Sequence, residues 1–172
     1  QLLPIIWIGA FVIPVFAGTG VSVAAQFMGA QQHHRVVPAY MMNLLCTGLM
    51  AIGFAAVLYF FASDLGRWMG LPSDLNAIGA TYLGSMSAYM IPLGVLVAYN
   101  AVLSSRGLTH WLMYSSFAVA GLNITLVAIF VLGVGWGVRG VVAGSVISVT
   151  TAATISMWLV HHRLGIRFRV RG

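Results

Sequence analysis

The feature that most constrains this chain is a series of five long apolar stretches separated by short polar connections. Runs of about 20 apolar residues match the roughly 30 Å hydrocarbon core of a bilayer. Of the 172 residues, 60% are hydrophobic and only 6% are charged, whereas soluble domains carry about a quarter charged residues. A soluble bundle with so few charges could not cover its surface with polar groups. The sequence therefore predicts an all-α, polytopic transmembrane helix bundle.

Turn signals and polar residues divide the chain into spans. The predicted spans are residues 2–30, 39–62, 75–103, 111–132 and 141–160. All connections are short, so we expect neighbouring spans to be antiparallel. The connection at 63–74 contains Asp64 and Asp74, the two carboxylate side chains of the chain. We interpret both aspartates as turn formers and not as acid–base groups.

The arginines are distributed unequally between the two ends of the spans. One end collects six of the eight basic residues: Arg35, Arg106, Arg163, Arg167, Arg169 and Arg171. The other end has only Arg67 and Arg139. The positive-inside rule predicts that the arginine-rich end, with a cationic tail at 161–172, is cytoplasmic. After an odd number of crossings the N-terminus is then outside, and we expect one further span upstream.

Small residues at four-residue spacing predict close helix packing, because lipid gives helices no hydrophobic reason to associate. The last span has such a stripe along one whole face. Its members are Gly140, Gly144, Ser148, Ala152 and Ser156. Shorter stripes occur around Gly84 in the third span and Gly18 in the first. These stripes indicate a tight multi-helix bundle without deciding its function.

Polar side chains at membrane depth are the candidates for a binding site, because each is costly there unless partnered. We single out Asn100 and Asn123 as substrate-binding candidates, since an amide both donates and accepts hydrogen bonds. For Asn123, substrate binding and interhelical hydrogen bonding remain equally open. Asn123 lies near the middle of its span, whereas Asn100, Asn43 and Gln26 lie nearer the cytoplasmic ends of theirs. For Asn43 and Gln26, interhelical hydrogen bonding is the favoured interpretation.

Several classes of function lack support in the residues. The histidine pairs at 33–34 and 161–162 have no third ligand nearby, so we expect membrane-surface histidines, no metal site and no cofactor. No nucleophile triad, phosphate loop or carboxylate pair is present, so we expect no enzyme. Nucleic-acid binding would need a soluble platform. A single cysteine, Cys46, excludes an intrachain disulfide.

Three segments, taken in order, resemble the multidrug and toxic-compound extrusion (MATE) family. The first is Ser22–Ala30, similar to the family's second helix and first cytoplasmic loop. The second is the loop Val102–Thr109, and the third combines Leu122–Ile124 with Gly137–Ala143. The resemblance extends over nearly the whole chain. It implies that residues 1–172 are a partial N-terminal lobe, helices two to six, of a twelve-helix transporter with two lobes.

The chain departs from the family pattern at one informative position. Some family members have an acidic residue one turn after the asparagine of helix five, but Val127 stands one turn after Asn123. No acid occurs in any predicted span. We therefore expect the carboxylate that couples ion movement to transport to lie in the first helix or in the other lobe.

The resemblance implies a secondary-active antiporter that exports cationic or amphipathic drugs or metabolites in exchange for protons or sodium by alternating access. The implied partners are the small-molecule substrate, the coupling ion, membrane lipids, and the missing first helix and second lobe. The implied location is the cytoplasmic membrane of a bacterium. Two alternatives remain: a flippase for lipid-linked oligosaccharides from the same superfamily, and a membrane scaffold that does not transport.

Overall fold

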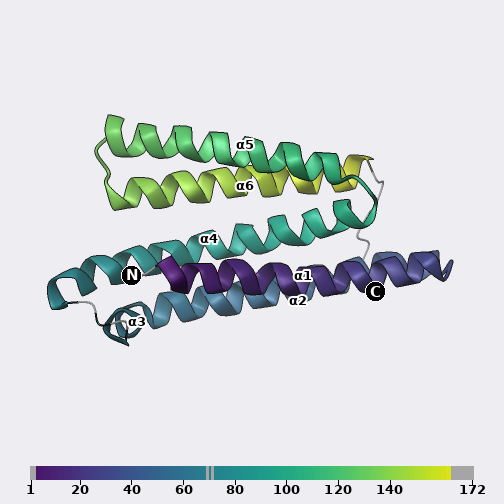
Figure 1. Cartoon of the computed structure of the whole chain (residues 1–172), viewed down its shortest axis with the longest axis horizontal. Helices are drawn as coiled ribbons and strands as arrows, with labels where there is room; N and C mark the ends of the chain where they lie inside the picture. Colours follow the sequence, from purple (N-terminus) through teal and green to yellow (C-terminus); the bar gives the residue numbers. More distant parts are fainter. Residues whose placement is uncertain (1–2, 69, 71, 164–172) are drawn as a thin grey trace.

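The computed structural model describes residues 3–68, 70 and 72–163, and it is helical nearly throughout (Figure 1). The elements are α1 (Leu3–Gly29), α2 (His33–Phe60), α3 (Ala62–Trp68), α4 (Ser73–Ser105), α5 (Thr109–Ala128), η1 (Ile129–Gly133) and α6 (Val138–Arg163). Among the described residues, five helices are long and apolar enough to cross a membrane. The predicted all-α transmembrane bundle is confirmed.

The ends of the helices differ from the predicted spans in two connections. Helix α2 begins at His33 and not at residue 39, because Gln31 adopts a φ of 58° and completes the reversal within the preceding turn. The connection at 63–74 is not only a loop, since α3 occupies its first half. Asp64 lies in the first turn of α3 and contacts Arg67 at 3.9 Å on the exposed surface.

The end of the fourth span and the tail also depart from the prediction. Helix α5 continues as the short π-helix η1, which the sequence did not predict. Gly135 and Gly137 then adopt positive φ values of 74° and 53° and turn the chain into α6. Helix α6 extends through residues 161–163 of the predicted tail. The remainder of that tail, 164–172, lies outside the described residues.

Helix α4 is the central element of the bundle. It packs against α1 and α2 on one side and against α6 on the other, and α3 lies near its beginning (Figure 1). Helix α5 packs mainly on α6 and touches α4 much less. None of the residues of α5 is buried. The fourth span, α5, is therefore a peripheral helix that α6 holds beside the rest of the bundle.

The small-residue stripe of α6 makes the close contact that the sequence predicts. A Cβ on Gly144 would lie 2.8 Å from Cγ2 of Val127, and one on Gly140 would lie 3.0 Å from Cβ of Phe130. The shorter stripes behave differently, because a Cβ on Gly84 or Gly18 would meet nothing within 4 Å. Among the predicted stripes in the described part of the chain, only that of α6 has glycines in close contact with a neighbouring helix.

Close approaches also occur outside the predicted stripes, and one of them joins α2 and α4. A Cβ on Gly94 of α4 would overlap the Cβ of Ala51 on α2. Ala51 is itself fully buried, in a cluster with Leu58, Leu83 and Met90. The absence of a side chain at Gly94 therefore lets α2 and α4 meet, as small residues do in membrane helix pairs.

A second cluster forms at the arginine-rich end around Tyr40, whose side chain is 1% exposed. The Tyr40 hydroxyl lies 2.7 Å from Oγ of Ser105. Ser105 donates its own proton to the carbonyl of Val102 at 2.8 Å, so Tyr40 is the donor in the first bond. Arg106 lies over the Tyr40 ring, with Cζ 5.9 Å from the ring centroid. These contacts fix α2 against the end of α4.

The Tyr40 bond gives a first prediction. Tyr40→Phe is expected to lower the free energy of unfolding by about 1 kcal/mol, the usual net contribution of one hydrogen bond. The loss should be no larger, because Ser105 keeps its bond to Val102. Equilibrium unfolding of the full-length protein in mixed micelles measures it. Tyr59→Phe, at a ring that is 64% exposed, is the control and should change nothing. A loss of several kcal/mol would show that the hydroxyl has a further role.

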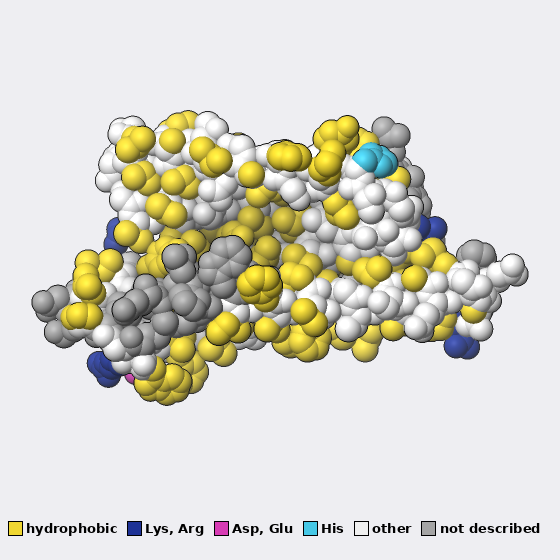
Figure 2. Space-filling model, in the orientation of Figure 1, with side chains coloured by type: hydrophobic (Ala, Val, Ile, Leu, Met, Phe, Trp, Pro, Cys, Tyr) yellow, Lys and Arg dark blue, Asp and Glu magenta, His cyan; other side chains and the backbone are white. Residues whose placement is uncertain are grey.

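The surface separates apolar flanks from charged ends. Figure 2 shows hydrophobic side chains along the length of the visible face, and dark-blue basic side chains only near its two ends. The connections place Arg35 and Arg106 at one end and Arg67 and Arg139 at the other. This pattern is the one expected for helices that cross an apolar layer.

Candidate functional site

The structure brings the two predicted site residues, Asn100 and Asn123, into one groove. The groove lies between α4 and α5 and has a volume of about 360 Å³. Its wall consists of Leu96 and Asn100 from α4, and Ser115, Ser116, Val119, Ala120, Asn123 and Ile124 from α5. The groove exists because α5 packs mainly on α6, which leaves the faces of α4 and α5 only partly in contact.

Each asparagine is oriented by a serine of α6. Ser156 donates a hydrogen bond of 2.9 Å to Oδ1 of Asn100. Nδ2 of Asn123 donates a hydrogen bond of 3.2 Å to Oγ of Ser145. Ser145 is 8% exposed and Ser156 is fully buried. The interhelical hydrogen bonding that the sequence left open for Asn123 is therefore present.

Each of these bonds engages only one polar atom of the side-chain amide, Oδ1 in Asn100 and Nδ2 in Asn123. Within the described part of the chain, no hydrogen bond engages the amide nitrogen of Asn100 or the carbonyl oxygen of Asn123. Both residues are partly exposed and line the groove. An amide nitrogen has two N–H donors and an amide oxygen has two lone pairs. The groove therefore offers a donor on α4 and an acceptor on α5.

Helix α6 supplies the two serines that orient the asparagines of the site. Its close approach to α5 at Gly144 and Val127 brings Ser145 within reach of Asn123. The sequence pointed to Ser156 only as a packing residue and did not point to Ser145. Neither serine could have been assigned to a particular asparagine, since the pairing depends on how α6 lies against α4 and α5.

The sequence prediction of the site also did not include the serines of α5. Ser115 and Ser116 line the groove on the same side as Asn123. Ser116 lies about two turns before Asn123, and residues at that separation share a helix face. That spacing is a signal in the sequence that could have found it. Ser115 donates to the carbonyl of Leu112 at 3.0 Å, so its hydroxyl is already engaged within the helix.

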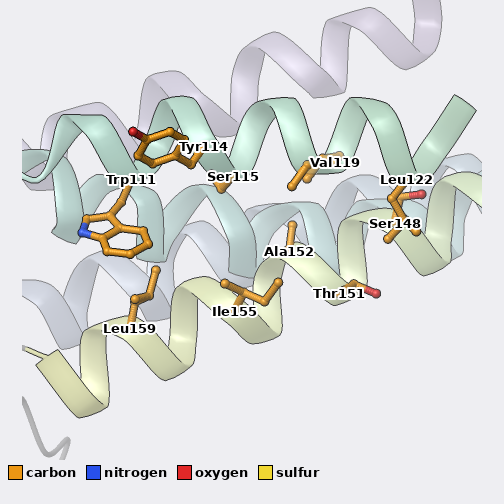
Figure 3. A pocket seen from close by; sticks show the side chains of 11 residues that line it. Trp111, Tyr114, Ser115, Val119, Leu122, Ser148, Thr151, Ala152, Ile155 and Leu159 are labelled. Carbon is orange, nitrogen blue, oxygen red and sulfur yellow. The ribbon is translucent and has the colours of Figure 1, made fainter.

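A second cavity lies between α5 and α6 and has a volume of about 410 Å³ (Figure 3). Trp111 and Val119 point into it from α5, and Ala152 points into it from α6 (Figure 3). The Ser148 and Thr151 hydroxyls on its wall donate to carbonyls of their own helix. This pocket is apolar and has little with which to orient a polar molecule, so the α4–α5 groove is the stronger candidate.

The other two predicted amides lie outside the groove. Asn43 is 6% exposed, and a Cβ on Gly20 of α1 would overlap its side chain. Its Oδ1 accepts a hydrogen bond of 3.4 Å from Thr47, one turn further along the same helix. Gln26 is exposed. For Asn43, close packing between α1 and α2 is the observed role, and the hydrogen bond is within one helix.

Charged and metal-binding groups are scarce near the groove. Among the described residues, no group of three histidine, cysteine or acidic side chains could hold a metal. His161 lies 2.8 Å from the carbonyl of Met157, and the His162 ring packs on Trp158 with centroids 5.1 Å apart. Asp64 is at the opposite end of the bundle from these histidines. The groove is lined by neutral side chains alone.

The relatives of the chain agree with this architecture. The MatE family model matches residues 2–129. The uncharacterized transporter YisQ of Bacillus subtilis (strain 168) is 26% identical over 144 residues, which cover 83% of this chain and 31% of that protein. The probable multidrug resistance protein YoeA of the same organism is 26% identical over 158 residues, 90% of this chain and 34% of that protein. The chain spans about a third of the length of these relatives.

Solved structures show the same fold. One is an inward-facing conformation of a multidrug resistance MATE family transporter of the MOP superfamily, and another is MATE in the bent conformation. Each has a TM-score of 0.85 and 19% sequence identity, and each match covers 92% of this chain and 36% of the solved chain. Since the family model also covers most of the sequence, the chain belongs to the MatE family of membrane transporters.

Proposed function

We propose that this chain forms helices two to six of the N-terminal lobe of a secondary-active antiporter. The transporter exports cationic or amphipathic drugs or metabolites in exchange for protons or sodium by alternating access. The observation that supports this best is the α4–α5 groove, where Asn100 and Asn123 each keep half of an amide unengaged. Membrane transporters place substrate sites between spanning helices, and this groove extends from Asn123 near the middle of its span to Asn100 near the arginine-rich end of α4.

The chemistry of the groove suits such substrates. The Asn123 carbonyl oxygen offers a partial negative charge to a cation, and Leu96, Val119 and Ile124 offer apolar surface to an amphipathic molecule. No arginine lines the groove. A lipid-linked oligosaccharide carries phosphates that need cationic partners, so the groove favours an exporter of cations over a flippase.

The coupling ion requires a group from elsewhere in the transporter. Asp64 lies in α3 beside Arg67, away from the groove, and the spans contain no carboxylate. We therefore place the ion-binding carboxylate in the preceding helix or in the second lobe, both of which are proposed partners of this bundle. The arginine-rich end is proposed to face the cytoplasm of a bacterial cell.

A transport assay on the full-length protein tests the proposal. Proteoliposomes are loaded with a fluorescent lipophilic cation, and an inward proton or sodium gradient is then imposed. We expect dye efflux that is several-fold faster than in protein-free vesicles and that stops when an ionophore removes the gradient. A parallel assay follows translocation of a fluorescent lipid-linked sugar phosphate. If dye efflux does not depend on the ion gradient for any cation tested, the protein is not an antiporter of these cations. If only the lipid-linked sugar phosphate is translocated, the protein is a flippase.

A further inference from the structure

A third cavity lies between α1 and α2, on a part of the bundle that the candidate site does not use. It has a volume of about 490 Å³ and shares no residue with the α4–α5 groove. Its wall is mainly apolar, with Phe16, Val23 and Phe27 from α1 and Met42 and Cys46 from α2. Cys46, the single cysteine of the chain, is exposed here. We call this cavity the α1–α2 groove.

The length of the α1–α2 groove matches one leaflet of a bilayer. On α2 it extends from Arg35 to Cys46, about eleven residues, which is roughly 16 Å at the 1.5 Å rise of an α-helix. On α1 it extends over a similar length, from Phe27 to Phe16. Half of a hydrocarbon core is about 15 Å. The groove therefore begins at the arginine-rich end and finishes near the middle of the membrane.

The polar groups of the groove differ along its length. Deep in the groove, Thr19 donates to the carbonyl of Phe16 at 2.7 Å, and Oδ1 of Asn43 accepts from Thr47. At the mouth, Arg35 is exposed and has no carboxylate partner among the described residues. Apart from the amide nitrogen of Asn43, which makes no hydrogen bond within the described part of the chain, the wall is apolar where an acyl chain would lie. The exposed Arg35 lies where a headgroup would lie.

We propose that the α1–α2 groove binds an anionic phospholipid from the leaflet at the arginine-rich end. One acyl chain lies along Phe27, Val23 and Phe16, and the headgroup phosphate contacts the guanidinium of Arg35. Guanidinium groups bind phosphate oxygens with charge-assisted hydrogen bonds. Because lipid tails are as apolar as the groove wall, the tail gains little hydrophobic free energy by entering it. The headgroup contact therefore decides which lipid is retained.

Native mass spectrometry of the full-length protein tests this proposal. The protein is purified, stripped of lipid, and titrated with phosphatidylglycerol or with phosphatidylcholine of the same acyl chains. The wild type is expected to retain phosphatidylglycerol preferentially. Arg35→Gln is expected to weaken that retention about fivefold, the factor for one basic group near an anionic surface. Arg35→Lys should keep part of the affinity, since it preserves the charge without the planar fork.

Arg106→Gln is the matched control. It removes the same charge from an exposed arginine at the same end of the bundle, but Arg106 does not line the groove. It should change retention by less than about twofold. Equal losses in Arg35→Gln and Arg106→Gln would attribute lipid retention to overall surface charge and overturn the proposal. Equal retention of the two lipids by the wild type would overturn it as well.

A second variant tests the groove without altering charge. Ala39 lines the groove and is partly exposed, so Ala39→Phe places a ring where the acyl chain would lie and leaves Arg35 intact. Loss of phosphatidylglycerol at an unchanged melting temperature would support the proposed position of the chain. Full retention by a folded Ala39→Phe variant would place the lipid elsewhere. Arg35 is exposed, so its variants keep the test valid if Ala39→Phe does not fold.

Discussion

Asn123→Ala is expected to lower gradient-driven export by the full-length protein about tenfold, and Asn100→Ala about fivefold. Each substitution removes an amide that faces the α4–α5 groove with an unengaged donor or acceptor. Oδ1 of Asn123 can accept from the N–H of a cationic substrate, and a hydrogen bond to a charged partner contributes about 1.5–3 kcal/mol, a factor of ten or more in binding. The Asn100 N–H can bond only a neutral acceptor on such a substrate, at about 1 kcal/mol, a factor of about five. Initial rates of dye efflux from proteoliposomes, measured across substrate concentrations, give the effect on apparent affinity and on maximal rate separately.

Two serine variants separate substrate binding from helix cross-linking. Ser145→Ala removes the bond to Asn123, and Ser156→Ala removes the bond to Asn100. Both leave the asparagine in the groove. Interhelical hydrogen bonds in membranes contribute about 0.6 kcal/mol on average, so these variants should keep most of the export activity. If the serine variants lose as much activity as the asparagine variants, the amides act only as links to α6.

Gly144→Val is expected to disrupt the bundle itself. A Cβ at position 144 would lie 2.8 Å from Cγ2 of Val127 and 3.0 Å from its backbone nitrogen. Movement of a side chain cannot relieve a contact with the backbone, so α5 and α6 must separate. Overpacking of a close contact costs about 1–3 kcal/mol, and we expect the upper end of that range. The yield of monodisperse full-length protein and its melting temperature should both decrease.

Gly121→Val provides the matched comparison on α5. Gly121 also lies inside a spanning helix, but a Cβ there would meet nothing within 4 Å. The two substitutions add the same side chain to the same kind of backbone, so a difference between them reports the approach of α5 to α6. Similar melting temperatures for the two variants would show that Gly144 is not a contact that the bundle requires.

The resemblance to the family, carried by short segments in the right order, was the most informative part of the sequence. The family match confirms it over residues 2–129. The membrane helices could also be predicted, because a span needs only enough consecutive apolar residues to cross the hydrocarbon core. The two short elements, α3 and η1, could not be predicted from the sequence. Helix α3 and the π-helix η1 contain no periodic signal of their own, and neighbouring packing decides their form.

The candidate site was predicted in part. Asn100 and Asn123 could be selected because polar side chains at membrane depth need partners. Their partners could not be selected, since Ser145 and Ser156 are two of many hydroxyl residues in α6. The spans are apolar around most of their circumference, so periodicity does not identify the face that points toward protein.

The sequence by itself determined the membrane class, the number of spans and the unequal distribution of arginines between the two ends. These properties depend on local hydrophobicity and charge, which a chain has before it folds. The tertiary structure decided which of the small-residue stripes makes a contact, that α5 leaves a groove beside α4, and that the two asparagines share it. Those properties depend on how helices pack against one another. Because lipid is as apolar as the helices, a helix face that contacts lipid has much the same hydrophobicity as one that contacts protein, so the sequence does not show which faces pack.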